Sequence, residues 1–258
     1  MSGAHEDLHR LARVARALVS EIPEHPRSGS PRDAESRALR GTDGGGGVAR
    51  AALLDRLNTD AQILAANLTL VIDAIADCFE VAARRDNRVN TPAVSIIVRT
   101  ALELAAQAAW LLDDTIDGLT RARRYLVWRF DDLSDRRLLL REFRPDNGDT
   151  DSAEADLDSE EAALLADVTD AKWGASATTT NPKGVTPAAL LDGGRREGMP
   201  KITEMIRLVS SSRSIYGLLS ITAHGSRFGL MQGLKADGPP DSRGHRDAQV
   251  EGFGLVCV

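Results

Sequence analysis

Cysteine is scarce in this chain of 258 residues, which contains only Cys78 and Cys257. Two cysteines so far apart do not form a metal-binding pair, and they are too few for a disulfide scaffold. The first residues also lack the apolar core of a signal peptide. We therefore expect a cytoplasmic protein that keeps its thiols reduced.

Lysine and aromatic residues are also rare. Four of the 32 basic residues are lysine, the aromatic content is 4%, and the net charge is −6. Binding along nucleic acid without sequence preference depends on neutralising many phosphates, so this acidic balance argues against such a protein. A local basic site that contacts RNA remains compatible with it.

Long apolar runs are missing as well. The longest apolar stretch, residues 92–112, is interrupted by three polar side chains four residues apart, Arg99, Glu103 and Gln107. A charged residue is costly inside a bilayer, so we interpret this stretch as a buried helix of a soluble protein and expect no membrane association.

Two strong catalytic motifs are absent too. The chain has no glycine-rich phosphate loop after a strand and no G-x-S-x-G. Its one E-x-x-H, at residues 6–9, is a single copy, whereas the dinuclear sites of four-helix bundles need two copies and further carboxylates. We therefore expect neither a metal nor a cofactor.

Apolar residues recur at helical spacing along most of the chain, and no run alternates as a strand would. This pattern predicts an all-α fold, a bundle of about five to seven helices. We expect an N-terminal helix at 1–22, a flexible linker at 23–47, one helical-bundle domain at 48–235 and a mostly disordered tail at 236–258.

Several boundaries can be predicted more closely. The run Asn58-Thr59-Asp60 resembles a cap that starts a second helix within 48–85, and Thr91 with Pro92 resembles the start of the apolar helix. We expect a Thr-, Gly- and Pro-rich loop at 174–200 and a last helix at 201–224.

An arginine-rich helix is predicted at 118–143. Eight arginines lie between residues 121 and 144 against four acidic residues, and residues 145–170 then carry ten acids and no base. The arginines have the right chemistry for phosphate. We favour a solvated helix face, partly neutralised by an acidic loop that leads into a helix near 159–172.

Two polar lines on apolar helices are the candidate site. In "YGLLSITAHGSRFG", residues 216–229, Tyr216, Ser220 and His224 are four residues apart, and Arg99, Glu103 and Gln107 follow the same spacing. Residues four apart lie on one face of a helix. We therefore expect both lines to meet in one polar cluster.

The chemistry of that cluster has two interpretations. Charged groups on an apolar helix need partners, so the residues fit a structural hydrogen-bond network. A histidine at the end of its helix, close to an arginine and a glutamate, also fits a general acid or base.

The segments "RTALELAAQAAWLLDD", "RARRYLVW" and "YGLLSITAHG" resemble those of bacterial all-helical proteins with an R-x-x-x-E helix and a late Y-x-x-x-S-x-x-x-H helix. The resemblance covers about residues 50–230 and extends, distantly, to the HEPN and abortive-infection superfamily. It implies a homodimer whose cleft brings together R-x(4–6)-H motifs that cut RNA without a metal.

In that comparison His224 matches the motif's histidine. Positions 217–219 hold Gly, Leu and Leu where the motif has its arginine, so Arg99 would supply the phosphate contact from another helix.

The leading hypothesis from the sequence is therefore a HEPN-like, metal-independent RNase of a defence or stress system. His224, Arg99 and Glu103 would be catalytic, and Tyr216, Ser220 and Gln107 would bind the substrate. The alternative is a non-catalytic helical bundle that binds a partner protein or a small ligand, with a structural polar cluster. A third hypothesis, an enzyme acting on a metabolite in the bundle core, has no motif behind it.

Overall fold

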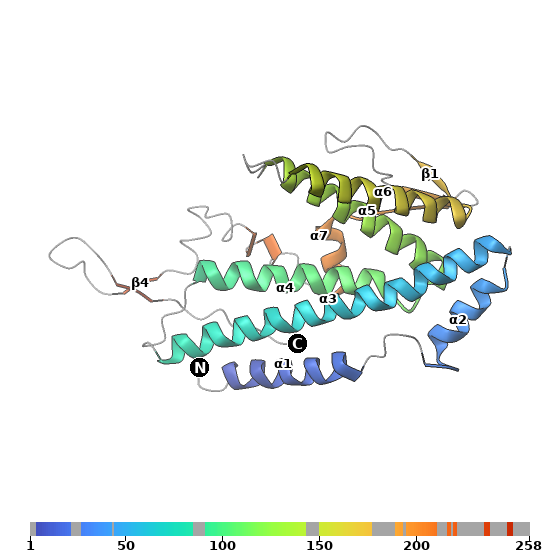
Figure 1. Ribbon diagram of the computed structural model, residues 1–258. Helices are drawn as coiled ribbons and strands as arrows, with labels where there is room; N and C mark the ends of the chain where they lie inside the picture. Colours follow the sequence, from blue (N-terminus) through green and yellow to red (C-terminus); the bar gives the residue numbers. More distant parts are fainter. Residues whose placement is uncertain are drawn as a thin grey trace. The chain divides into compact units, whose positions relative to one another are not determined.

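The computed structural model describes residues 4–21, 27–42, 44–84, 91–142, 150–176, 189–192, 195–210, 216–217, 219–220, 235–237 and 247–249. Helices hold most of these residues, which confirms the predicted all-α fold (Figure 1). The α-helices are α1 (Ala4–Glu21), α2 (Pro31–Arg40), α3 (Gly45–Arg84), α4 (Thr91–Leu111), α5 (Gly118–Glu142), α6 (Thr150–Asp170) and α7 (Ile202–Met205).

The short strands are β1 (Gly174–Ser176), β2 (Ala189–Asp192), β3 (Arg195–Gly198), β4 (Lys235–Asp237) and β5 (Asp247–Gln249), and Ile206–Leu208 form the 3₁₀-helix η1. Strands β1, β2 and β3 pair antiparallel in that order, with Gly174 opposite Leu191 and Ala189 opposite Gly198. Strands β4 and β5 form a separate antiparallel pair.

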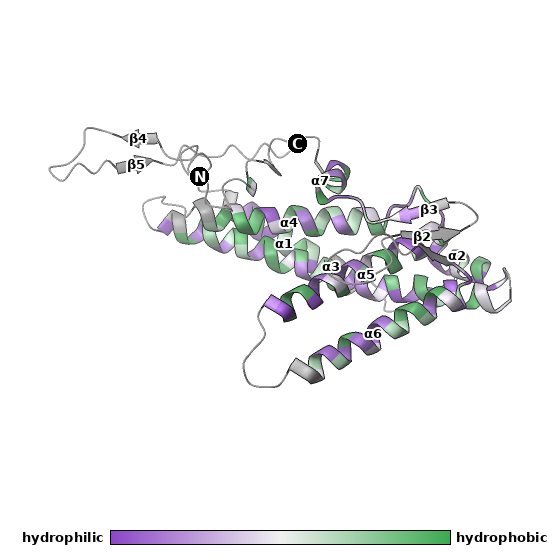
Figure 2. Cartoon of the chain, turned by 90° about the horizontal axis from the view of Figure 1, so that it is seen from above, coloured by the Kyte–Doolittle hydropathy of each residue, from purple (hydrophilic) through white to green (hydrophobic). Residues whose placement is uncertain are grey.

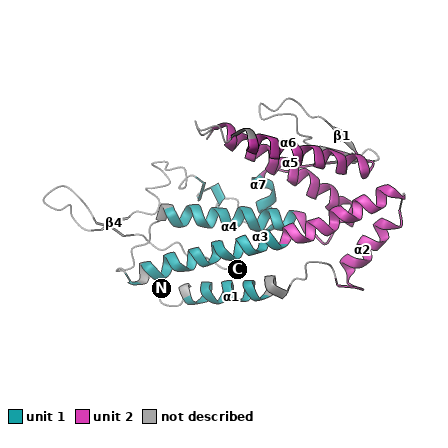
Figure 3. Cartoon of the chain, in the orientation of Figure 1, with its two compact units in different colours: residues 1–22, 62–110, 202–258 teal, residues 23–61, 111–201 magenta. Residues whose placement is uncertain are grey.

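In place of one domain at 48–235, the chain divides into two compact units (Figure 3). Unit 1 contains residues 1–22, 62–110 and 202–258, and unit 2 contains residues 23–61 and 111–201. Helix α3 is continuous and contributes its first part to unit 2 and its second part to unit 1.

Unit 1 contains α1, the second part of α3 and α4, which run alongside one another (Figure 3). Small and aliphatic side chains from these helices are buried, together with residues of the late segments; they include Ala12, Leu64, Ile75, Ala76, Ala106, Trp110, Met205, Ile206, Tyr216 and Leu219.

Unit 2 is built around α5, which packs against α2, α6 and the three-stranded sheet. Its largest fully buried side chains include Arg123, Phe130, Leu53, Leu57, Leu126, Leu133 and Leu190. In Figure 2, α6 carries hydrophilic and hydrophobic residues along its whole length, as expected of a helix with one face on the core.

The segment expected to be a flexible linker at 23–47 contains helix α2. The Ser30 side chain accepts a hydrogen bond from the Asp33 amide at 3.2 Å, and Pro31 occupies the first helical position. Proline is tolerated there because that amide would have no partner within the helix. Pro31 therefore starts a helix within the range expected to be a linker.

The expected helix start at Asn58–Asp60 is also wrong, because α3 runs through it without a break. These polar side chains bond to other helices rather than to their own backbone. Asn58 accepts a hydrogen bond from Arg32 at 2.8 Å, and Asp60 accepts one from the Tyr125 hydroxyl at 2.8 Å.

The acidic segment 145–170 is more helical than expected, since α6 begins at Thr150 rather than near 159. The loop expected at 174–200 contributes all three strands of the small sheet. Within the expected tail, residues 235–237 and 247–249 are paired strands, and its other residues lie outside the described part of the chain.

The helix expected at 201–224 is not continuous. Helix α7 ends at Met205, and η1 follows at Ile206–Leu208. Val209 then forms a turn and Ser210 follows, and a serine side chain competes with the backbone for its hydrogen bonds, which disfavours a helix interior. The backbone is helical at residues 216–217 and 219–220.

Two stretches, Gly45–Val81 and Ala93–Leu111, are long and apolar enough to cross a membrane by length and composition. This is weak evidence, because the core helices of soluble proteins pass the same test. The second stretch contains Arg99 and Glu103, which are paired with each other.

The start of α3 gives the first prediction. A Cβ on Gly47 would overlap the carbonyl oxygens of Leu39 and Thr42, whereas a Cβ on Gly45 would meet no atom within 4 Å. We expect Gly47→Ala to lower the free energy of unfolding by about 1–3 kcal/mol through overpacking. The matched Gly45→Ala should be neutral or stabilising by up to about 1 kcal/mol. Urea denaturation of both variants measures this, and equal stabilities would contradict the close approach.

Candidate functional site

The apolar helix α4 carries one ion pair, between Arg99 and Glu103. Arg99 Nε donates to Glu103 Oε1 at 2.8 Å, one helical turn away. The side chains are 25% and 28% exposed. Water therefore reaches both charges, and the fully buried pair that the apolar flanks suggested is not formed.

Tyr216 joins this pair from a segment more than a hundred residues later. Its hydroxyl donates to the same oxygen, Glu103 Oε1, at 2.7 Å, and the Arg99 guanidinium lies 5.6 Å from the centre of its ring. The ring is buried, at 7% exposure. The geometry combines a charge-assisted hydrogen bond with a cation–π contact, and it attaches the late segment to α4.

The electrostatics of this cluster follow from these contacts. The hydrogen bond that Arg99 donates to Glu103 raises the pKa of Arg99, so the guanidinium stays charged. Burial, and then the hydrogen bond to Glu103, raises the pKa of Tyr216. Tyr216 is therefore a neutral hydrogen-bond donor at physiological pH, and the cluster as a whole is one cation paired with one anion.

Three of the six predicted site residues thus meet, as the two polar lines suggested. Gln107 and Ser220 each lie one turn further along from Glu103 and Tyr216 and are half-buried. Among the described residues, no hydrogen bond joins either of them to the cluster. His224 lies outside the described residues, so its place in the cluster stays a prediction.

The arginine-rich helix α5 is paired with acids rather than open to phosphate. The acidic segment is helix α6, and its side chains meet those of α5 along several turns. The pairs are Arg129 with Glu160, Arg136 with Glu160, Arg137 with Asp158, and Arg137 with Glu161. Acidic side chains therefore neutralise part of the charge of α5, as expected, but they lie on helix α6 and not on a loop.

Towards its start, α5 makes further pairs within unit 2. Arg121 pairs with Glu35 of α2, and Arg124 donates to Glu197 of β3 at 2.9 Å. Arg129 also donates to Asp60 at 2.9 Å. Because acidic side chains of unit 2 pair with these arginines, α5 holds unit 2 together. For the same reason it is a poor candidate for a nucleic-acid surface.

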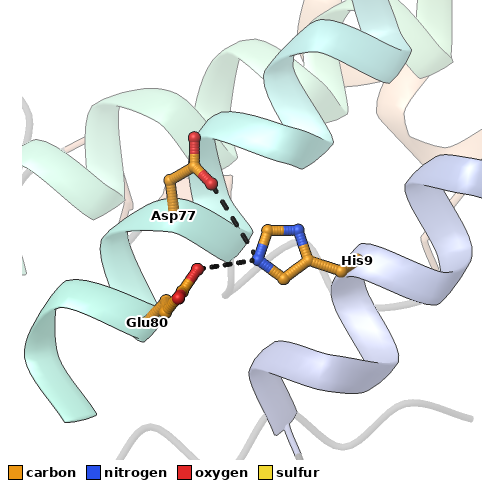
Figure 4. A group of neighbouring side chains, drawn as sticks. All are labelled: His9, Asp77 and Glu80. Carbon is orange, nitrogen blue, oxygen red and sulfur yellow. Dashed lines mark hydrogen bonds and ion pairs between the residues drawn. The ribbon is translucent and has the colours of Figure 1, made fainter. Parts of the chain in front are cut away.

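A second polar cluster was missed from the sequence. His9 of α1 lies against Asp77 and Glu80 of α3 (Figure 4). The available signal was the run H-E-D-L-H at 5–9, which matches the H-E-x-x-H pattern, together with a D-x-x-E at 77–80. Residues three or four apart share a helix face. Only the packing of α1 on α3 joins the two.

Comparisons with protein-family models, with curated proteins and with solved structures find no match to this chain. Its function therefore has to be inferred from the geometry of its own residues.

The Glu103–Tyr216 contact gives the second prediction. Tyr216→Phe removes only the hydroxyl, and Glu103→Gln removes the charge but keeps an acceptor. We expect a double-mutant cycle of these two variants to give a coupling of about 1–2 kcal/mol in the free energy of unfolding.

The matched control is Thr100→Ala on the exposed side of α4, where the hydroxyl bonds only to the Ile96 carbonyl of its own helix. It should change stability by less than about 0.5 kcal/mol. Strictly additive effects of Tyr216→Phe and Glu103→Gln would contradict the contact.

The α5–α6 pairing gives the third prediction. Burial alone would raise the pKa of Glu160, but hydrogen bonds from Arg136 and Arg129 outweigh it and hold that pKa below its usual value. A lowered pKa contributes stability above the unfolded value, about 4.3, and this stability is lost as the pH falls through the folded value. Glu160→Gln should therefore cost about 1–2 kcal/mol at pH 7 and progressively less below about pH 4.

Denaturant titrations between pH 7 and pH 3 measure this difference. Glu154→Gln, an exposed carboxylate on the same helix, should match the wild type throughout. If the loss of stability caused by Glu160→Gln does not become smaller in acid, Glu160 does not stabilise the protein through its charge.

Proposed function

We propose that this chain is a HEPN-like helical protein that cleaves RNA without a metal ion. The observation that carries the proposal is the convergence of Arg99, Glu103 and Tyr216, from segments far apart in the chain, at a place that solvent reaches. RNA has to enter from solvent, and an arginine fixed by a glutamate and an aromatic ring is oriented before the substrate arrives.

In the proposed reaction Arg99 binds the scissile phosphate and stabilises the charge that develops on it. Glu103 and Tyr216 hold the guanidinium in position, and Ser220 and Gln107 line the approach. The sequence places His224 four residues after Ser220, and we assign it the proton transfer. The ribose 2′-hydroxyl attacks the phosphorus, the 5′-oxygen leaves with a proton, and a 2′,3′-cyclic phosphate results.

A homodimer in the cytoplasm is part of this proposal, since HEPN-like clefts form between two copies. Support comes from an apolar line on α3, where Ile63, Leu70 and Val81 are more than 45% exposed. Their spacings of seven and eleven residues place them on one face of the helix. A second copy that covers this face would bury the line, and no membrane is required.

The second candidate function is a non-catalytic bundle that binds a partner protein. It is favoured by one feature of the cluster, the single oxygen Glu103 Oε1 that accepts from both Arg99 and Tyr216. In such a protein the three side chains satisfy one another and only hold the late segment against α4.

The fourth prediction separates the two functions. Purified protein should cut single-stranded RNA in the presence of EDTA and leave 2′,3′-cyclic phosphate ends. His224→Ala should reduce the rate by about 10²–10⁴-fold, which is the usual contribution of a general acid or base. Arg99→Lys should fail as well, because an ammonium group cannot make the two-pronged contact of a guanidinium with phosphate.

His25→Ala is the matched control, prepared in the same way, and should cut as the wild type does. Contaminating RNases would cut equally well in every preparation, including that of His224→Ala, which therefore reports them. Intact RNA after incubation with a folded wild-type dimer, verified by light scattering, would reject catalysis and leave the binding function.

A further inference from the structure

The strongest unassigned feature outside the proposed RNA site is the cluster formed by His9, Asp77 and Glu80 in unit 1. His9 Nε2 lies 3.3 Å from Glu80 Oε2 and 3.9 Å from Asp77 Oδ1 (Figure 4). One ligand atom from each residue lies within 4.8 Å of the others. An imidazole nitrogen and two carboxylate oxygens therefore point at one position between α1 and α3.

These separations fit a bound metal ion. Zinc binds histidine nitrogen and carboxylate oxygen at about 2.0–2.2 Å, which in a tetrahedron places ligand atoms about 3.3–3.6 Å apart. The contact between His9 and Glu80 already has this separation, at 3.3 Å. Asp77 is slightly further away, and its side chain is 69% exposed, so it has room to turn inward.

A neighbouring arginine holds one of the three ligands in place. Glu80 also accepts a hydrogen bond from Arg84 through its other oxygen, Oε1, so Arg84 fixes the orientation of the carboxylate and leaves Oε2 facing His9. Outer contacts of this kind orient the ligands of many metal sites. One turn earlier on α3, Asp73 pairs with Arg16 of α1, which sets the register of the two helices.

We propose that His9, Asp77 and Glu80 form a site for a divalent transition-metal ion, with Zn²⁺ as its reference ion. The imidazole selects this class over Mg²⁺ and Ca²⁺, which prefer ligand sets made only of oxygen. Three protein ligands leave one position for water. The bound ion fastens α1 to α3, and the site is separate from Arg99, Glu103 and Tyr216, so RNA cleavage does not depend on it.

The test is metal binding by the full-length protein after dialysis against EDTA. Calorimetric titration with Zn²⁺ should give one ion per chain for the wild type. His9→Gln and Asp77→Asn each remove one ligand and should weaken binding by at least about tenfold. At the same zinc concentration, Zn²⁺ should raise the Tm of the wild type more than that of either variant, because an ion stabilises the folded state in proportion to how tightly it binds it.

Two control variants define the site. Asp7→Asn changes an exposed carboxylate on the same helix, outside the cluster, and should bind zinc as the wild type does. Cys78→Ser removes the thiol next to Asp77 and should also bind normally. Titration with Co²⁺ adds a readout independent of stability, since the visible spectrum of a four-coordinate ion with nitrogen and oxygen ligands lacks the intense thiolate charge-transfer band.

The outcomes are distinct. Circular dichroism establishes that each variant is folded, and Glu80→Gln replaces any ligand variant that is not. Wild type that binds no zinc at a 1:1 ratio would overturn the proposal and leave His9 as a hydrogen-bond partner of Glu80. Binding that survives His9→Gln unchanged would also overturn it, by showing an adventitious site on other histidines.

Discussion

The pairing of guanidinium groups with carboxylates from other helices is the interaction on which unit 2 depends. Arg129 of α5 is its centre, because it donates to Asp60 of α3 at 2.9 Å and also pairs with Glu160 of α6. Three helices therefore meet at one side chain. Arginine suits this position because its planar fork reaches two carboxylates at once, which the single ammonium group of lysine cannot do in a fixed geometry.

The helices themselves were predictable from the sequence because their signals are local. The start and end of α4 and α5 match the expected ranges within one residue, and Pro92 and the spacing of apolar residues suffice to place them. The errors arose where one residue type serves two purposes. Pro31 ends a helix in most contexts but starts α2, and Asp60 resembles a helix cap but accepts hydrogen bonds from α5. Only the packing of one helix against another decides between these uses.

In the candidate site, too, the sequence predicted the local spacing of the residues but not how they pack. The four-residue spacing of Arg99 and Glu103, and of Tyr216 and Ser220, was visible in the sequence, and the meeting of Glu103 with Tyr216 followed from the need of a charged group for a partner. The degree of burial did not follow. An apolar helix was expected to hide its ion pair, yet both side chains reach water, because α4 keeps one side partly open. Because water reaches both side chains, a substrate could reach them as well, which a fully buried network would not allow.

The two polar clusters of unit 1 differ in the kind of cation they hold. Arg99 carries its charge at every physiological pH, so Glu103 has a permanent partner within its own helix. Asp77 and Glu80 face a histidine, whose imidazole nitrogen is also a common metal ligand. A metal ion bound there would come from solution, whereas the Arg99 cluster contains its own cation. The His9 cluster therefore suits the binding of an ion. The Arg99 cluster suits the contact with phosphate that we propose.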